Sequence, residues 1–152
     1  MSGETKQALK KEIAELKHRL AAQGRVEEAL QESERIINRS PAVAFLWKNA
    51  EGWPVEYVSR NVSRIFGYDA EAFLSGSLSY VALIHPEDRD TVTREVAEYS
   101  RDPQREEFVH RPYRIVTSKG DMRWMDDRTA IRRDDQGRIT HFQGIVLDIT
   151  EK

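Results

Sequence analysis

The side chains best able to do chemistry in this sequence are its histidines and one pair of adjacent carboxylates. His85 precedes a proline that would begin a helix, whereas His110 and His141 alternate with other residues in strand-like runs, where they would face solvent or a partner. His18 lies in a charged helical stretch. Since no two histidines have the spacing of a metal site and no carboxylate cluster accompanies them, the sequence predicts no metal centre.

Asp126 and Asp127 form the carboxylate pair, in an alternating run where one of the two would point inward. A buried carboxylate needs a hydrogen-bonding partner, which Tyr113 or Arg111 could supply. We favour a structural hydrogen bond over ligand recognition. The pair could equally straddle a sheet edge, with neither carboxylate buried.

The sequence contains no catalytic signature. It has no Gly-rich phosphate loop with a lysine, no Gly-x-Ser-x-Gly and no His-Glu-x-x-His. The absence of cysteine also excludes disulfides, iron–sulfur clusters and thiol nucleophiles. We therefore expect no catalysis within this chain.

Composition narrows the remaining classes of function. A formal charge of −2 leaves no basic excess for binding nucleic acid. No apolar run is long enough for a signal peptide or a membrane span. We therefore expect a cytoplasmic protein with no nucleic-acid partner and no membrane segment within this chain.

Residues 1–39 have the pattern of an amphipathic helical segment. The apolar residues Leu9, Ile13, Leu16 and Leu20 are 4, 3 and 4 residues apart, which is the spacing of a coiled-coil seam. After Gly24 the same steps resume out of phase at Val26, Leu30, Ser33 and Ile37.

This change of phase near Gly24 has two explanations. Either one helix changes its winding locally, or two helices meet near residues 22–24, which we favour. The narrow apolar stripe predicts a homodimeric coiled coil rather than a solvated helix lying on its own domain. Parallel and antiparallel pairing both stay open.

Residues 40–152 have the shorter periods of an α+β domain. Asn61 or Ser63 would cap a first short helix, and Asp69 a second. The expected strands cover 43–47, 55–58, 107–117, 122–132 and 139–149, and the expected helices 61–66, 70–74 and 86–100. This order predicts a five-stranded antiparallel sheet with small helices on one face.

Several motifs in this second region resemble the PAS sensory domain, in the variety with a tryptophan in a central strand. The matching segments are 57–61 (YVSRN), 65–68 (IFGY), 84–89 (IHPEDR), 113–120 (YRIVTSKG) with 123–124 (RW), and 144–150 (GIVLDIT). The resemblance covers residues 38–151. It implies a sheet wrapped by helices around a small-molecule cavity, with flanking helices that pass a signal to an effector domain.

The resemblance also bears on cofactors. Light-sensing relatives place a glutamine against flavin where this chain has Val146, and they need a cysteine for their adduct. Covalent flavin photochemistry is therefore excluded, and noncovalent flavin is disfavoured. Haem-binding relatives commonly use a histidine of the long helix, and residues 91–100 contain none. The cofactor, if there is one, stays unknown.

Strand alternation places one face of the sheet toward such a cavity. The candidate lining residues are Phe66, Tyr99, Tyr113, Ile115, Met125, Asp127, Phe142 and Val146. On the last strand, the opposite face carries His141, Gln143, Ile145 and Leu147. We expect Trp124 to pack against a neighbouring strand.

The C-terminal residues resemble the exit of the family toward its effector. Asp148 and Thr150 would fix the chain at the end of the last strand, and Glu151-Lys152 would begin a linker.

The sequence as a whole predicts a sensory and signal-transmission module of a multidomain protein. Its histidine kinase or diguanylate cyclase domain would lie before Met1 or beyond Lys152. We expect a homodimer formed through the N-terminal helix and the flanking sheet face. The alternative is a structural dimerisation and relay domain whose core is filled by its own side chains and binds no ligand.

Overall fold

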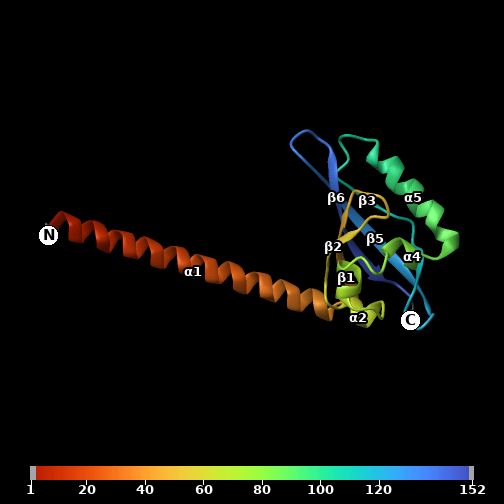
Figure 1. Ribbon diagram of the computed structural model, residues 1–152, viewed down its shortest axis with the longest axis horizontal. Helices are drawn as coiled ribbons and strands as arrows, with labels where there is room; N and C mark the ends of the chain where they lie inside the picture. The colour runs from red at the N-terminus through yellow and green to blue at the C-terminus, as the bar shows by residue number, and fades with distance from the viewer. Residues whose placement is uncertain (1–2, 151–152) are drawn as a thin grey trace. The chain divides into compact units, whose positions relative to one another are not determined.

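The computed structural model describes residues 3–150 of the chain. The chain divides into two compact units, Met1–Ile36 and Ile37–Lys152, and each is described by itself. Residues 3–150 contain five helices and six strands (Figure 1), and none of these helices is long and apolar enough to cross a membrane. The expected linker residues Glu151 and Lys152 lie outside the described range.

Helix α1 (Gly3–Arg39) supplies the first unit and runs without a break through Gly24. The expected joint between two helices near residues 22–24 is therefore wrong. An internal glycine costs only about 1 kcal/mol relative to alanine, and the helix formers on both sides of it offset that cost. In one continuous helix, Leu9, Leu16, Leu30 and Ile37 are 7, 14 and 7 residues apart and share one heptad position. The expected change of phase is therefore limited to Val26 and Ser33, because Leu30 and Ile37 continue the first register.

The apolar seam of α1 is exposed to solvent. The side chains of Leu9, Ile13, Leu16, Leu20, Val26 and Leu30 are between 47% and 68% exposed. Ile37 differs, because it is half-buried and belongs to the second unit. An exposed apolar stripe of this length suits a coiled coil, but the dimer stays a prediction.

The second unit is built on an antiparallel sheet. Its strands are β1 (Ala42–Lys48), β2 (Val55–Val58), β3 (Glu107–Val109), β4 (Tyr113–Val116), β5 (Met122–Arg133) and β6 (Ile139–Asp148). They are ordered β2-β1-β6-β5-β3, and β4 also pairs with β5. The predicted α+β class and the antiparallel sheet are confirmed.

The expected strand over 107–117 is divided into β3 and β4. Pro112 has no N–H to donate to a strand ladder, and the chain bends away from β5 between the two halves. Both halves still pair with β5, with Phe108 opposite Thr129 and Tyr113 opposite Met125. Residues 3–150 therefore form six strands rather than the expected five.

Four short or medium helices, α2 (Val62–Ile65), α3 (Ala70–Leu74), α4 (Tyr80–Leu83) and α5 (Pro86–Ser100), lie between β2 and β3. α5 has the predicted range, and His85 Nδ1 accepts a hydrogen bond from the N–H of Glu87 at its start (3.1 Å). Asn61 and Asp69 precede α2 and α3, but neither side chain makes a capping bond, and Ser63 lies inside α2. α4 was not predicted, since four residues carry too little periodicity.

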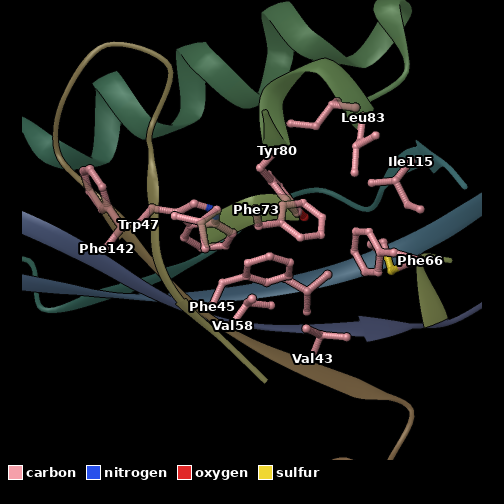
Figure 2. Close-up of a cluster of buried hydrophobic side chains, with 14 of the residues drawn as sticks. Val43, Phe45, Trp47, Val58, Phe66, Phe73, Tyr80, Leu83, Ile115 and Phe142 are labelled. Atoms are coloured by element: carbon pink, nitrogen blue, oxygen red, sulfur yellow. The ribbon is translucent and has the colours of Figure 1, made fainter. Parts of the chain in front are cut away.

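The core lies between the helices and one face of the sheet (Figure 2). The predicted inward face is confirmed, because Tyr113, Ile115, Met125, Asp127, Phe142 and Val146 are all buried. Gln143 and Ile145, on the other face of β6, are exposed.

An aromatic cluster fills the centre of this core. Phe45 stacks on Trp47 with ring centroids 5.1 Å apart, and Tyr80 lies edge-on to Phe45 at 4.8 Å. Gly144 of β6 lies against the indole, since a Cβ atom there would be 2.4 Å from Trp47 Cζ3. Glycine at this position therefore lets the tryptophan pack directly against the sheet.

Candidate functional site

A small cavity lies in the core of the second unit, against the inward face of the sheet. It offers about 20 Å³ to the centre of a water-sized molecule, which is room for about one water. Its walls are Trp47, Trp53, Tyr80, Ile84, Val92, Val96, Phe108, His110, Tyr113, Asp127, Thr129 and Phe142.

Three of the eight predicted lining residues, Tyr113, Asp127 and Phe142, form part of these walls. Four others, Phe66, Ile115, Met125 and Val146, are buried elsewhere in the core. Tyr99 is half-buried and stacks on Phe108, with ring centroids 4.9 Å apart. The alternation of the strands placed Tyr113, Ile115, Met125, Asp127, Phe142 and Val146 inside but could not identify which of them border empty space. Their role in binding stays a prediction.

Asp127 is the polar centre of the cavity wall. The hydroxyl of Tyr113 donates to Asp127 Oδ2 (2.7 Å), and the hydroxyl of Thr129 donates to Asp127 Oδ1 (2.9 Å). Tyr80 in turn shares a hydrogen bond with Tyr113 through their hydroxyls. Of the two predicted partners of the carboxylate, Tyr113 bonds it and Arg111 does not, since within residues 3–150 the hydrogen bond of Arg111 is from its backbone N–H to Glu95.

Burial dominates the electrostatics of this network. It raises the pKa of Asp127 above its ordinary value, against the opposing effects of His110 and of the hydrogen bonds from Tyr113 and Thr129. Burial, followed by the nearby Asp127 carboxylate, also raises the pKa of Tyr80 and Tyr113 well above their ordinary value. The tyrosines therefore stay protonated and act as hydrogen-bond donors.

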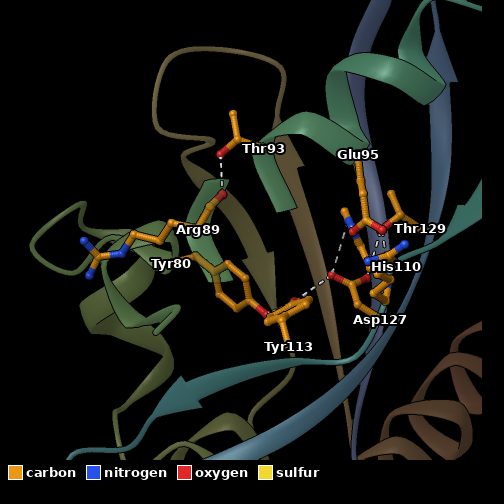
Figure 3. Close-up of polar contacts among 9 residues, drawn as sticks. Tyr80, Arg89, Thr93, Glu95, His110, Tyr113, Asp127 and Thr129 are labelled. Atoms are coloured by element: carbon orange, nitrogen blue, oxygen red, sulfur yellow. Dashed lines mark hydrogen bonds and ion pairs between the residues drawn. The ribbon is translucent and has the colours of Figure 1, made fainter. Parts of the chain in front are cut away.

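His110 is a site residue whose placement the sequence did not predict. It is only 4% exposed, with Nδ1 2.9 Å from Glu95 Oε1 of α5 and Nε2 3.9 Å from Asp127 Oδ2 (Figure 3). The expectation that it faces solvent or a partner is wrong, because the break between β3 and β4 turns it inward. Pro112, two residues later, was the available signal. Across residues 3–150, no three His, Asp or Glu side chains form a group that could hold a metal ion.

Two tryptophans complete the cavity. Trp47 is 5% exposed, and its buried Nε1 has no hydrogen-bond partner among residues 3–150. Trp53 has a φ of 47°, a left-handed conformation that is strained for a bulky residue. Trp53 and Tyr80 also line a neighbouring surface cleft of about 300 Å³, so these two side chains lie between the cleft and the cavity.

The end of β6 carries the predicted exit residues. Asp148 Oδ1 accepts a hydrogen bond from the N–H of Thr150 (2.9 Å), and Thr150 Oγ1 accepts one from the N–H of Trp124 (2.7 Å). Asp148 Oδ2 also lies 3.5 Å from Arg123 Nη1. Trp124 itself is exposed and lies beneath the guanidinium of Arg114 on the neighbouring β4.

A group of hydrogen bonds also holds the connection between α1 and β1. Asn61 is buried, and its Nδ2 donates to the carbonyls of Ile37 (2.8 Å) and Ala42 (2.6 Å). Its Oδ1 accepts a hydrogen bond from the hydroxyl of Ser59 (2.6 Å). Asn61 therefore ties the last turn of α1 and the first residue of β1 to the loop before α2.

Comparisons with known proteins agree on one family. The model of the family described as PAS fold matches residues 55–146. The chain is 39% identical over 141 residues to the methyl sulfide methyltransferase-associated sensor of Methanosarcina acetivorans, which covers 93% of this chain and 14% of that protein. It is 30% identical over 121 residues to the two-component sensor PprA of Pseudomonas aeruginosa, covering 77% of this chain and 12% of that protein. The chain thus spans a small part of the length of these relatives.

Solved structures share the fold at low identity. A PAS domain from Colwellia psychrerythraea has a TM-score of 0.66 and 15% identity, covering 82% of this chain and 99% of that one. The N-terminal domain of a diguanylate cyclase with PAS/PAC sensor from Marinobacter aquaeolei has a TM-score of 0.58 and 20% identity. The match covers 72% of this chain and 95% of that one. A sensory box histidine kinase/response regulator from Burkholderia thailandensis has a TM-score of 0.58 and 24% identity. The match covers 75% of this chain and 81% of that one.

Proposed function

The chain belongs to the PAS fold family, and we propose on that basis that it is a sensory and signal-transmission module of a multidomain cytoplasmic signalling protein. Two of its relatives are named sensors, and the chain spans only 14% and 12% of their lengths. The effector would be a histidine kinase or a diguanylate cyclase elsewhere in the protein, as in the multidomain proteins that share its fold. Catalysis would belong to that effector.

Small-molecule sensing at the aromatic cavity is the first part of this proposal. The observation that carries it is the buried hydrogen-bond network of Tyr80, Tyr113, Asp127 and Thr129, which joins α4, β4 and β5 around the cavity. A ligand that accepted a hydrogen bond from Trp47 Nε1 or displaced one within the network would change the packing of helices on the sheet.

A route from the cavity to the exit follows the pairing of β5 with β6. Asp127 lies opposite Val146, and Met125 lies opposite Asp148. A displacement of β5 at Asp127 would therefore reach Asp148 within two residues. Since Asp148 and Thr150 hold the end of β6, this displacement would alter the direction in which the chain leaves the domain.

The alternative function is a ligand-free structural relay, and the size of the cavity favours it. About 20 Å³ admits no molecule larger than a water unless side chains move. A sensor would have to open the cavity toward the neighbouring cleft of about 300 Å³ by moving Trp53, whose strained backbone lowers the cost of such a change.

A ligand screen separates the two functions. The purified chain is examined by absorption spectroscopy and native mass spectrometry, and its melting temperature is measured against a set of small metabolites. A sensor should retain a ligand or show a saturable rise in melting temperature that Trp53→Ala or Asp127→Asn alters. If the chain retains no ligand and none of the metabolites raises its melting temperature, the structural relay is the function that remains.

Dimerisation through the seam of α1 and the flanking sheet face is the second part of the proposal. The exposed Leu16 and Leu20 would be covered by the partner helix. Leu16→Glu should therefore shift the full chain toward monomer in light scattering, whereas Ala14→Glu, with the same change of charge at an exposed position away from the seam, should not. A wild-type chain that is monomeric at tens of micromolar would contradict this part.

A further inference from the structure

A polar cleft of about 190 Å³ lies apart from the aromatic cavity and shares no wall residue with it. One wall is α2 with Gly67, and the other is the turn between β4 and β5 with the start of β5. The N–H of Ser118 donates to the carbonyl of Phe66 (3.1 Å), which fixes the two walls relative to each other. A Cβ atom at Gly67 would lie 2.1 Å from Ser118 Oγ, so glycine allows this close approach.

The walls of this cleft are predominantly cationic. Arg64, Lys119 and Arg123 line it together with one carboxylate, Asp121. Lys119 makes no ion pair within residues 3–150. The excess of two positive charges, in a chain whose formal charge is −2, is a local reversal of sign.

Both guanidinium groups keep donors for a further partner. Arg64 uses Nη2 to donate to the carbonyls of Asn38 (2.9 Å) and Ser40 (2.9 Å), and Arg123 approaches Asp148 through Nη1 at 3.5 Å. A guanidinium carries five N–H donors, so several remain on each residue. Thr117 and Ser118 also line the cleft and carry hydroxyl groups that can act as neutral donors, whereas the hydroxyl of Ser63 already donates to the carbonyl of Arg60 (3.2 Å).

We propose that this cleft binds the phosphate group of a small molecule. Guanidinium groups match the planar spread of phosphate oxygens, and a lysine adds a point charge without a fixed geometry. An excess of two positive charges suits a dianion, and the cleft offers about 190 Å³ to the centre of a water-sized molecule, against about 20 Å³ in the aromatic cavity.

The position of the cleft gives such a ligand access to both ends of the domain. Arg64 contacts the connection between α1 and β1 through Asn38 and Ser40, and Arg123 contacts Asp148 at the end of β6. A phosphate that drew both guanidinium groups together would bind in competition with these contacts. The site would therefore act where α1 joins the sheet and where the chain leaves it, independently of any ligand in the aromatic cavity.

The test is a titration of the full chain with inorganic phosphate, with chloride adjusted to hold the ionic strength constant. Backbone amide shifts are followed by nuclear magnetic resonance, and the amides of Ser118 and Lys119 should shift saturably. Lys119→Gln should weaken the binding by about fivefold, as expected for removing one exposed ion pair. Arg94→Gln, which removes an exposed arginine of α5, should leave it unchanged.

Three results would overturn the proposal. If the amide shifts at the cleft do not saturate, phosphate acts by general ionic screening and the cleft is no binding site. The same conclusion follows if Lys119→Gln and Arg94→Gln change the shifts equally. Equal binding of malonate, a dianion of different shape, would show that the cleft recognises charge alone and would remove the assignment to phosphate. The ammonium of Lys119 makes no ion pair within residues 3–150, and the hydrogen bond from its backbone N–H to Thr117 Oγ1 does not depend on the side chain, so Lys119→Gln should leave the fold intact.

Discussion

Replacement of Gly144 by alanine tests whether the indole of Trp47 is held against the sheet. The new Cβ would lie 2.4 Å from Trp47 Cζ3 and 2.6 Å from Cη2, so one side must move by about 1 Å to reach van der Waals contact. Trp47 has little room to move, because it is 5% exposed, stacks on Phe45 at 5.1 Å and borders free space only at the cavity of about 20 Å³. Overpacking of this kind costs about 1–3 kcal/mol.

The backbone partly offsets this cost. Gly144 lies within β6, where alanine adopts the same extended conformation, and the loss of glycine freedom in the unfolded chain returns about 0.5–1 kcal/mol. The midpoints of these two ranges leave a net cost of about 1 kcal/mol, so we expect Gly144→Ala to lower the free energy of unfolding by about that amount. Urea denaturation followed by circular dichroism measures this value directly.

A double-mutant cycle with Trp47→Phe is the control. Phenylalanine lacks the outer ring that carries Cζ3 and Cη2, so Gly144→Ala should cost much less in the Trp47→Phe background. The coupling free energy between the two substitutions should be about 1 kcal/mol or more. A loss below about 0.5 kcal/mol in the wild-type background, or the same loss in both backgrounds, would refute the packing described for Trp47.

Three other substitutions test the pH dependence, the joint and the helix. Burial raises the pKa of Asp127, so the folded chain holds the carboxyl proton to higher pH than the unfolded chain does. The folded chain should therefore lose stability as the pH rises from about 3.9, the ordinary pKa of an aspartate, through the folded pKa. Asp127→Asn should remove this loss, as measured by urea denaturation at a series of pH values. Asn61→Ala leaves the buried hydroxyl of Ser59 without its acceptor and removes one of the donors to the carbonyls of Ile37 and Ala42, so it should cost about 1–3 kcal/mol in the same assay. Gly24→Ala meets nothing within 4 Å and should stabilise α1 by about 1 kcal/mol, seen as a later loss of helical circular dichroism on heating.

Local patterns in the sequence were sufficient for most of the fold. The alternation of β5 and β6 identified their buried faces, and Pro86 with two acidic residues identified the start of α5. Tyr113 was found as a partner of Asp127 because both lie on the same inward face. Each of these features depends on spacing along one or two neighbouring elements, which the sequence states directly.

The features that the sequence did not reveal depend on several elements at once. His110 is buried because β3 and β4 separate, and its partner Glu95 comes from α5, fifteen residues earlier. Only three of the eight predicted wall residues border the cavity, because empty space is what remains after all side chains have packed. The continuity of α1 at Gly24 reflects the sum of many small helix propensities rather than the preference of one residue.

The division of one expected strand into β3 and β4 has a consequence for solubility. An edge strand with a long row of unpaired N–H and C=O groups invites pairing with another molecule and is a route to aggregation. Here the outer edge beside β5 is formed by strands of three and four residues, separated by a segment containing Pro112, and the opposite edge strand, β2, has four residues. No edge of this sheet offers a long template, so copies of the domain can be held close together with little risk of forming extended intermolecular sheets.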